Sequence, residues 1–384
     1  MNTSSGSRTL TRDAEFDRHI DENNSVVVES MPIVASDALA TDATAYDAAL
    51  QAWRQQRREE LIQRVLEDFP QPIALRFHRY HRGAQKAREK IDHLRDTWEA
   101  VTIVYAALLI AEVRGAEVHG QTGRCPALGL DPGRIAFHNL RDPIDIVARI
   151  LGSDFDLRAT AFLKAQDRAR LVEVMGLLNS ERNGLAHKET PPEPECRRRL
   201  EICEPLVFDV LRILEPLTGC TVASYFDIEE GVTFQIYRGK GTERELETRP
   251  VTPAVKSTIL TLHDPKAHVI VLWDEEVFSL SPLIRWYDSG RGHQPLLAFL
   301  DDVSTRDGNL RYQTFGTTET FDTSSAKDVG FDRHIGRHSS GLLAEHELLR
   351  SLFRVKGGRA VAPRGRHGER DTASIAPVRM RLVK

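Results

Sequence analysis

The apolar residues of this chain change their spacing at Thr218-Gly219, and this change most limits what the chain can fold into. Before it, apolar residues recur every three or four positions, which is the period of an amphipathic helix. After it, short runs of β-forming residues alternate with turn signals, at intervals too short for crossover helices. We therefore predict an α+β fold, in which a helical bundle is followed by a small, mostly antiparallel β domain.

The helical pattern is strongest at residues 88–114. Apolar residues there line one face and charged residues the other, so we predict a long helix that forms the spine of the bundle. Residues 115–133, which are rich in Gly, are predicted to be a loop. Pro205 is expected to kink the last helix. Further helices are predicted at residues 46–68, 142–151, 157–187 and 195–217.

The β-forming runs are separated by clusters of turn residues. Among their aromatic residues, we interpret Trp273, Phe278, Trp286 and Tyr287 as core or hairpin positions. Gly239-Lys240-Gly241 is interpreted as a turn, because it lacks the context of a phosphate-binding loop. Strands are predicted at residues 221–228, 232–237, 268–273, 283–287, 296–303 and 310–315.

Four regions follow from these patterns. Residues 1–44 are acidic and show little apolar periodicity, so we expect a disordered segment. Residues 45–217 form the helical bundle, and residues 220–320 form the β accessory domain. Residues 321–384 are basic and rich in Gly, Arg and Pro, and we expect them to be largely disordered except for a short helix at 342–355.

Composition narrows the classes of function. The formal net charge of −4 neither requires nor excludes a nucleic-acid partner. The four cysteines form no C-x-x-C pair, so neither a disulfide framework nor a zinc knuckle is indicated. The longest apolar stretch, residues 101–111, is well below the roughly 20 residues that a membrane span needs, and no signal peptide is evident. We expect a cytoplasmic protein that is not in a membrane and uses no metal or other cofactor.

The residues best suited to catalysis lie where a bundle helix is predicted to end. Arg182 offers a planar fork of donors to phosphate oxygens. His187 can exchange a proton near neutral pH, and its place at a helix C-terminus favours the charged form. Asn183 can orient the His ring or hydrogen-bond a ribose or phosphate oxygen. No paired carboxylates with metal-ligand spacing accompany them, which favours metal-independent phosphodiester chemistry.

This Arg-Asn-x-x-x-His arrangement, followed by a polar loop and a closing amphipathic helix, resembles the HEPN superfamily over roughly residues 70–217. The signature of that superfamily is Arg, four to six residues and then His, commonly with Asn directly after the Arg. Arg182, Asn183 and His187 take these three positions in this sequence.

The resemblance implies a metal-independent endoribonuclease, a hydrolase of the toxin or antiviral phage-defence type. Arg182 would hold the scissile phosphate and His187 would transfer protons, with Asn183 in support and the ribose 2′-hydroxyl as the nucleophile. The resemblance also implies a homodimer whose two motifs form one cleft, with an antitoxin or a defence-complex protein as a further partner.

Two alternatives stay open. The motif could mark only a helix C-terminus, where Gly184 relaxes the last turn and basic residues meet the helix dipole. Some members of the superfamily also keep the fold without cleaving RNA. The chain could then be a catalytically silent scaffold that binds partner proteins, RNA or nucleotides in a defence or regulatory complex.

A basic run upstream of the spine helix could bind RNA. It contains Arg76, Arg79, Arg82 and Lys86, with aromatic residues interleaved. Such a stretch can follow an RNA backbone while a ring stacks on a base. The alternative is that the run is only the solvated entry to a helix.

One pentapeptide occurs twice in the chain. Residues 16–20 and residues 331–335 both read Phe-Asp-Arg-His-Ile. The repeat is either coincidental or a short docking motif that the chain presents twice.

Overall fold

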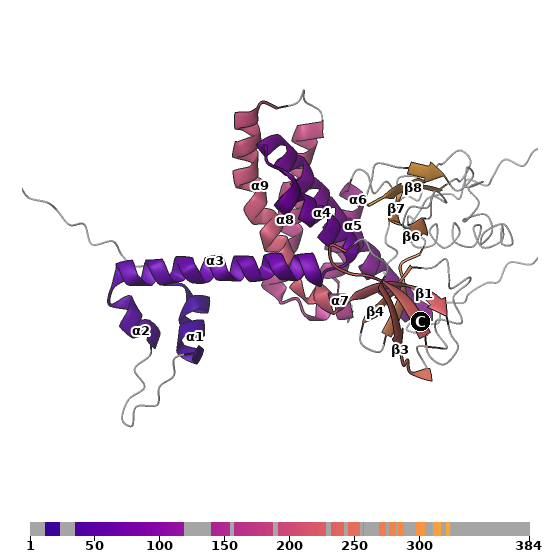
Figure 1. The fold of residues 1–384 in the computed structure, drawn as a ribbon, viewed down its shortest axis with the longest axis horizontal. Helices are drawn as coiled ribbons and strands as arrows, with labels where there is room; N and C mark the ends of the chain where they lie inside the picture. The colour runs from indigo at the N-terminus through magenta and orange to yellow at the C-terminus, as the bar shows by residue number, and fades with distance from the viewer. Residues whose placement is uncertain are drawn as a thin grey trace, which may run out of the picture.

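A computed structural model gives the structure of this chain. It describes residues 12–23, 35–118, 140–153, 157–186, 191–227, 232–241, 245–253, 256, 269–273, 276–281, 283–287, 296–303, 310–315 and 320–322. The fold is α+β, as predicted, with helices in the N-terminal part and two antiparallel sheets in the C-terminal part (Figure 1). No helix within these ranges is both long enough and apolar enough to cross a membrane.

The helices of the bundle pack around α5, which contacts α4, α6 and α9. A π-helical turn at Arg79–Gly83 follows α4, and a 3₁₀ turn at Glu215–Gly219 follows α9. Pro205 lies inside α9 without ending it. The helices are α1 (Ala14–Asn23), α2 (Ala35–Ala40), α3 (Ala43–Glu67), α4 (Gln71–His78), α5 (Ala87–Val118), α6 (Arg141–Leu151), α7 (Arg158–Ala161), α8 (Ala165–Ala186) and α9 (Glu193–Ile213).

The spine helix predicted at residues 88–114 is confirmed as α5. Every residue from 100 to 113 is buried, as expected of a helix that is apolar on nearly all sides. The helix continues to Val118, so the loop predicted from Gly115 is wrong for residues 115–118. A single Gly lowers helix propensity by only about 1 kcal/mol, and no Pro follows it there to break the helix. The rest of the predicted loop lies outside the described residues.

The single helix predicted at residues 157–187 is divided into α7 and α8. At the start of α7, the Glu112 carboxylate accepts a hydrogen bond from the backbone N–H of Ala159 at 3.0 Å. At its end, the Arg168 guanidinium donates to the carbonyl oxygen of Thr160 at 3.1 Å. Side chains from elsewhere thus satisfy the free backbone groups at the break, which the apolar spacing could not reveal.

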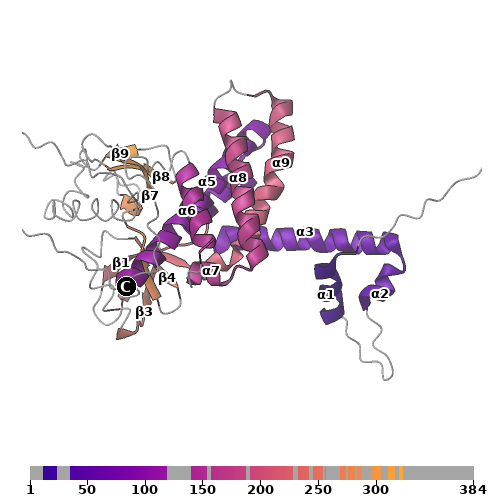
Figure 2. The same cartoon turned by 180° about the vertical axis from the view of Figure 1, so that it is seen from behind.

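Residues 1–44 were predicted to be disordered, but Ala14–Asn23, Ala35–Ala40 and the start of α3 are helical, so the prediction is wrong there. Phe16 of α1 packs against Tyr46 and Leu50 of α3 in a small apolar cluster. The segment has too few apolar residues to show a helical spacing in the sequence. Its helices are stabilised by the apolar side chains of α3, against which they pack. Figure 2 shows α1 and α2 at the outer end of α3, away from the bundle.

The helix α3 connects this outer cluster to the main core. Its C-terminal part buries Leu61, Ile62 and Val65 in the core of the bundle. Between the two apolar parts, residues 54–57 are exposed. The outer cluster is therefore carried on an arm, as Figure 1 shows.

The strands form two sheets, with the orders β3-β2-β1-β4-β5 and β6-β7-β8-β9. All the predicted strands are present. The strands β3, β5 and β9 were not predicted; β3 is a charged, exposed edge strand, and such sequences carry little β signal. The strands are β1 (Thr221–Asp227), β2 (Val232–Tyr237), β3 (Glu245–Arg249), β4 (Val269–Trp273), β5 (Glu276–Ser279), β6 (Ile284–Tyr287), β7 (Leu296–Val303), β8 (Leu310–Thr314) and β9 (Thr320–Asp322).

One apolar core joins the bundle to both sheets. Alternate residues of β4 face in opposite directions: Val269, Val271 and Trp273 belong to this core, while Ile270 and Leu272 belong to a second cluster on the other face of the sheet. Burial on both faces explains why β4 reads as a continuous apolar run. The predicted C-terminal helix at 342–355 lies outside the described residues, as does the basic tail.

The turn after β2 fastens the first sheet to the junction of α3 and α4. The backbone N–H of Gly239 donates to the carbonyl oxygen of Phe69 at 2.8 Å, and that of Lys240 donates to Leu66 at 2.8 Å. Gly239 has a positive φ of 62°, and a Cβ atom on it would lie 2.6 Å from the carbonyl oxygen of Glu67. The position therefore requires glycine for both conformation and space.

We predict that Gly239→Ala lowers the free energy of unfolding by about 1–3 kcal/mol, since the side chain would strain the turn and push it off α3. Gly241→Ala is the matched control, because a Cβ atom there would meet no atom of the described residues within 4 Å. Urea unfolding of the two variants and the parent measures the effect. Equal stability of the two variants would contradict this account of the turn.

Candidate functional site

The helix α8 carries two of the three predicted catalytic residues on its last turns. Arg182 and Asn183 both lie within α8, which extends to Ala186 and so ends near the predicted place. Asn183 is exposed. His187 lies outside the described residues.

Arg182 turns inward from α8 toward the spine helix. Its Nε donates to the Glu99 Oε1 of α5 at 2.6 Å. The Arg182 and Glu99 side chains are only 18% and 26% exposed. The guanidinium is thus held at the interface between two helices instead of extending into solvent.

This ion pair belongs to a larger arginine–carboxylate cluster, made of Arg76, Arg95, Asp96, Glu99 and Arg182. Arg76 of α4 donates from Nη1 to Asp96 Oδ2 at 2.8 Å. Arg95 lies between the two carboxylates, with its Nη2 3.3 Å from Asp96 Oδ1 and its Nε 4.0 Å from Glu99 Oε1. Since Asp96 and Glu99 are neighbours on one face of α5, the cluster brings Arg76 of the predicted basic run to the same helix face as Arg182.

Burial determines the electrostatics of this cluster. Burial raises the pKa of Glu99, and the positive charge of Arg182 opposes that rise. Burial likewise lowers the pKa of Arg76, while Asp96 opposes that change. Each charge is therefore tolerated because a partner of opposite sign lies beside it.

The four residues predicted to bind RNA lie in different surroundings. Arg76 is only 13% exposed and paired with Asp96, so it faces inward. Arg79 is half-buried, and Arg82 and Lys86 are exposed. Arg79 and Arg82 belong to the π-helical turn; such turns occur frequently at functional sites. The structure thus leaves Arg82 and Lys86 as the residues of this set with the most open access to a ligand.

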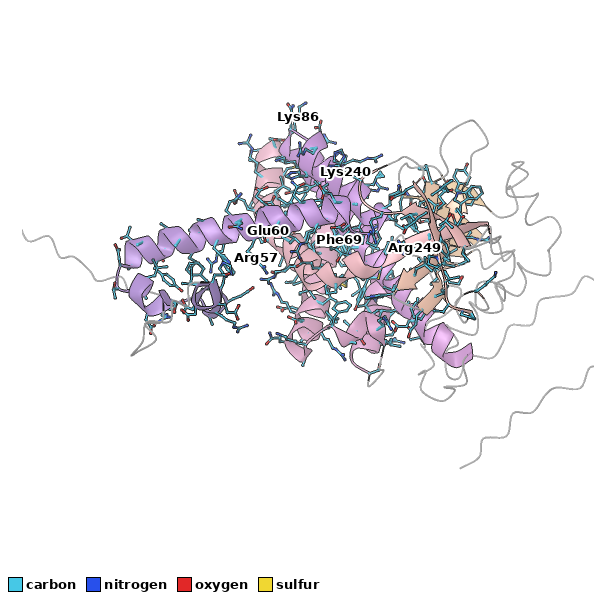
Figure 3. All side chains as sticks on the ribbon, turned by 60° about the horizontal axis from the view of Figure 1, so that its bottom comes forward. Arg57, Glu60, Phe69, Lys86, Lys240 and Arg249 are labelled. Atoms are coloured by element: carbon cyan, nitrogen blue, oxygen red, sulfur yellow. The ribbon has the colours of Figure 1, made fainter. Side chains whose placement is uncertain are left out.

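Lys240 joins this surface, although the sequence analysis treated it only as part of a turn. Burial lowers the pKa of His78, and the nearby positive charges of Lys240 and Arg82 lower it further. Arg82 and Lys240, which are both exposed, thus lie near His78, where α4, the π-helical turn and the turn after β2 come together in a basic patch. Figure 3 shows Lys86 and Lys240 on the same side of the molecule. No local signal could have found Lys240, because its neighbours come from residues far away in the sequence.

A second polar residue of α8 also escaped the sequence analysis. The Asn179 Oδ1 atom is buried and has no hydrogen-bond partner among the described residues. Asn179 precedes Arg182 by three positions, so the two side chains lie on neighbouring parts of the helix surface. A buried acceptor without a partner needs an explanation, and a bound donor group would supply one.

The described residues contain no group of three or more His, Cys, Asp or Glu side chains that could hold a metal ion. Asp92 also contacts Arg95, at 3.3 Å, so the three arginines of the cluster meet three carboxylates.

Comparison of the chain with models of known protein families, with curated proteins and with solved structures gave no match.

We predict that Arg182→Met lowers the free energy of unfolding by about 1–3 kcal/mol at pH 7.5, because it leaves the Glu99 carboxylate partly buried without its closest cation. The loss should be smaller at pH 5. Without Arg182 the pKa of Glu99 rises further, so the folded state takes up a proton at a pH where the unfolded state does not. The free energy of unfolding lost at pH 7.5 is therefore partly regained as the pH falls toward the ordinary pKa of a carboxyl.

Urea unfolding at both pH values measures this effect. Arg170→Met on the same helix is the control, since its partner Glu173 is exposed and its partner Asp209 keeps a second cation in Arg212. The loss of such a pair typically costs less than about 1 kcal/mol. Adding Glu99→Gln to Arg182→Met should remove the pH dependence. If Arg182→Met were no more harmful than Arg170→Met at pH 7.5, the buried pair would not matter.

Proposed function

We propose that this protein is a metal-independent endoribonuclease of the HEPN type, in which Arg182, Asn183 and His187 cleave RNA. The observation that carries the proposal is the inward position of Arg182. An ordinary helix end would present basic residues to solvent, but Arg182 is held against α5 beside Glu99. Such partly buried arginines at the edge of a bundle suit a site that binds and orients a phosphate.

The proposed reaction forms one bond and breaks one. A base takes the proton of the ribose 2′-hydroxyl, and the 2′-oxygen attacks the phosphorus. The bond to the 5′-oxygen breaks, and that oxygen leaves with a proton from an acid. His187 serves in this proton transfer, Arg182 neutralises the charge that builds up on the phosphate, and Asn183 supports them. The products are a 2′,3′-cyclic phosphate and a 5′-hydroxyl.

The Arg182–Glu99 pair sets a condition on this mechanism. A phosphate must compete with the carboxylate for the guanidinium, so binding of RNA would shift Arg182 away from Glu99 or share its donors. The basic patch around Arg82 and Lys240 supports the proposal, since exposed cations can attract an RNA backbone before it reaches Arg182.

The same ion pair also favours a second candidate. If the Arg182–Glu99 ion pair stays intact when ligands bind, Arg182 cannot hold the scissile phosphate. The chain is then a catalytically silent scaffold that binds partner proteins, RNA or nucleotides. In the enzymatic proposal, the protein acts as a toxin or phage-defence ribonuclease, and an antitoxin or a defence-complex protein would restrain it.

We predict that the purified chain cleaves RNA in the presence of EDTA, and that His187→Ala reduces the rate by about 10²–10⁴-fold. Arg182→Lys should also lose most activity, because an ammonium lacks the two-pronged geometry. Arg198→Ala is the control, since Arg198 is exposed and paired with Glu195 on α9. Product analysis should find 2′,3′-cyclic phosphate ends, and a 2′-deoxy substitution at the scissile nucleotide should block cleavage.

Two results would contradict the mechanism. Products with 5′-phosphates and an absolute need for magnesium would place the chemistry elsewhere. RNA left intact, together with equal growth inhibition by the parent and His187→Ala, would favour the scaffold.

We also propose a homodimer through the bundle, which would bring two copies of the motif to one phosphate. An exposed apolar pair beside the motif supports it: Leu177 of α8 is 46% exposed and Ile202 of α9 is 40% exposed. The contact between Arg199 and Glu181 shows that α8 and α9 run alongside each other here. Large apolar side chains that lie together on a surface are typical of interaction sites.

We predict that Leu177→Asp combined with Ile202→Asp gives a monomer by light scattering at micromolar concentration and abolishes RNA cleavage, because charges cannot be buried in the interface. Glu173→Lys and Glu201→Lys, at exposed positions on the same helices, control for a change in surface charge alone. A parent chain that is monomeric while it cleaves RNA would rule out the composite site.

A further inference from the structure

The repeated pentapeptide is part of a longer repeat. Each copy is preceded by a basic residue, an aspartate and two further residues, which gives the pattern basic-Asp-x-x-Phe-Asp-Arg-His-Ile at residues 12–20 and 327–335. The second copy has Lys327 where the first has Arg12. The structure describes the first copy, which forms the start of α1, so it shows what these side chains can bind.

The apolar side chains of the first copy dock on the outer part of α3. Phe16 is only 2% exposed. Its ring lies 5.3 Å from that of Tyr46 in an edge-to-face contact and 5.5 Å from that of Trp53. The His19 ring also lies against Trp53, at 5.8 Å, and Ile20 packs against the same cluster.

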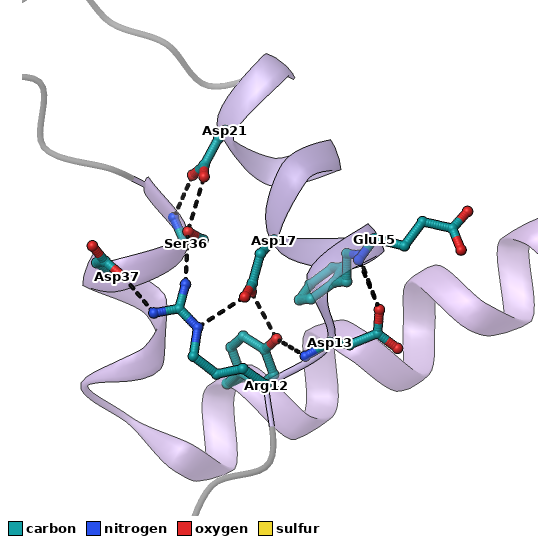
Figure 4. A network of polar contacts seen from close by, with 9 residues as sticks. Arg12, Asp13, Glu15, Asp17, Asp21, Ser36 and Asp37 are labelled. Atoms are coloured by element: carbon teal, nitrogen blue, oxygen red, sulfur yellow. Dashed lines mark hydrogen bonds and ion pairs between the residues drawn. The ribbon is translucent and has the colours of Figure 1, made fainter.

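The two repeated aspartates make polar contacts to α3, as Figure 4 shows in part. The Tyr46 hydroxyl donates to Asp17 Oδ1 at 2.7 Å and accepts from the backbone N–H of Asp13 at 2.9 Å. The Asp13 carboxylate pairs with Arg54 at 2.8 Å. It also caps α1, since Oδ1 accepts from the backbone N–H groups of Glu15 and Phe16, both at 3.1 Å. We call Tyr46, Leu50, Trp53 and Arg54 the α1-docking site.

Most of the repeated side chains touch this site, namely Asp13, Phe16, Asp17, His19 and Ile20. Arg18 is exposed, and Arg12 contacts Asp37 and Ser36 of α2. The two positions that differ are Ala14 and Glu15, both exposed, which are Val329 and Gly330 in the second copy. Contacts to α2 are kept less well: Asp21, which accepts from the backbone N–H of Ser36 at 2.9 Å, is replaced by Gly336. Glu15, which is not repeated, also contacts Arg57 of α3 at 3.6 Å. The repeat therefore preserves most, but not all, of the side chains that contact α3.

We propose that the α1-docking site is a peptide-binding site, and that its second ligand is the segment 327–335 of another copy of this chain. Asp328 would pair with Arg54, Asp332 would accept from the Tyr46 hydroxyl, and Phe331 would occupy the place of Phe16. Binding would displace α1 from this site, although Arg12 and Asp21 also join α1 to Ser36 of α2.

The segment that joins β9 to the second copy is short, which favours binding between two chains over binding within one chain. From Tyr46 to Glu67, α3 spans about 32 Å at 1.5 Å per residue, and the strands lie beyond its far end (Figure 1). The nine residues from Asp322, at the end of β9, to Phe331 reach at most about 32 Å when fully extended. The segment therefore does not reach the docking site of its own chain while β9 stays paired with β8.

A labelled peptide of residues 325–338 tests the binding by fluorescence anisotropy. The receptor is the full chain with Phe16→Ala and Phe331→Ala, which frees the site and removes the competing copy. We expect the peptide to bind this chain at least tenfold more tightly than the same peptide with Phe331→Ala, and more tightly than it binds the parent chain. A peptide of residues 10–23 should bind more tightly still, because it keeps Arg12 and Asp21.

Failure of the 325–338 peptide to bind would overturn the proposal, whether or not the 10–23 peptide binds. Light scattering tests the exchange between chains, in the Leu177→Asp and Ile202→Asp background that removes the bundle dimer. With Phe16→Ala, the average molecular mass should increase as the protein concentration increases. Adding Phe331→Ala should restore the mass of the same background without either substitution. No rise with Phe16→Ala would show that the second copy does not join chains, independently of any RNA cleavage.

Discussion

The rest of the structure depends on the burial of α5. Its residues 100–113 are buried on all sides, and an apolar helix of this kind must be surrounded by other elements. The helices α4, α6 and α9 pack around it, and β5 contacts it from the β region. Three carboxylates of α5 lie in partly buried surroundings and need partners. Asp96 pairs with Arg76, Glu99 pairs with Arg182, and Glu112 accepts from a backbone N–H at the start of α7.

The candidate site contains one of these carboxylate pairs. A partly buried carboxylate at Glu99 needs a cation, and Arg182 supplies it from the end of α8. The pairing lowers the cost of burying both groups and fixes the direction of the guanidinium. It also occupies the Nε donor of Arg182, so stability and phosphate binding would depend on the same side chain.

How much of this could be predicted from the sequence depends on the range of the interactions. The periodic apolar residues of α5 and α3 predicted their helices, because that signal is local. The folding of α1 was missed, since Phe16 becomes a core residue only when Tyr46 and Trp53 surround it. Arg182 was identified from its motif, but Glu99 was one charge among many on a helix face. Lys240 lies near His78 because the turn at Gly239 is hydrogen-bonded to the junction of α3 and α4. These residues are distant in the sequence, so no local pattern could predict their proximity.

The exposed stretch of α3 at residues 54–57 gives the outer cluster an unusual mechanical connection to the main core. A continuous helix transmits both position and rotation, about 1.5 Å and 100° for each residue. One residue inserted into this stretch would leave both apolar clusters intact, yet turn the outer cluster by more than a quarter of a circle about the axis of α3. The length of this short polar segment therefore sets the direction in which α1 and its docking site face a neighbouring molecule.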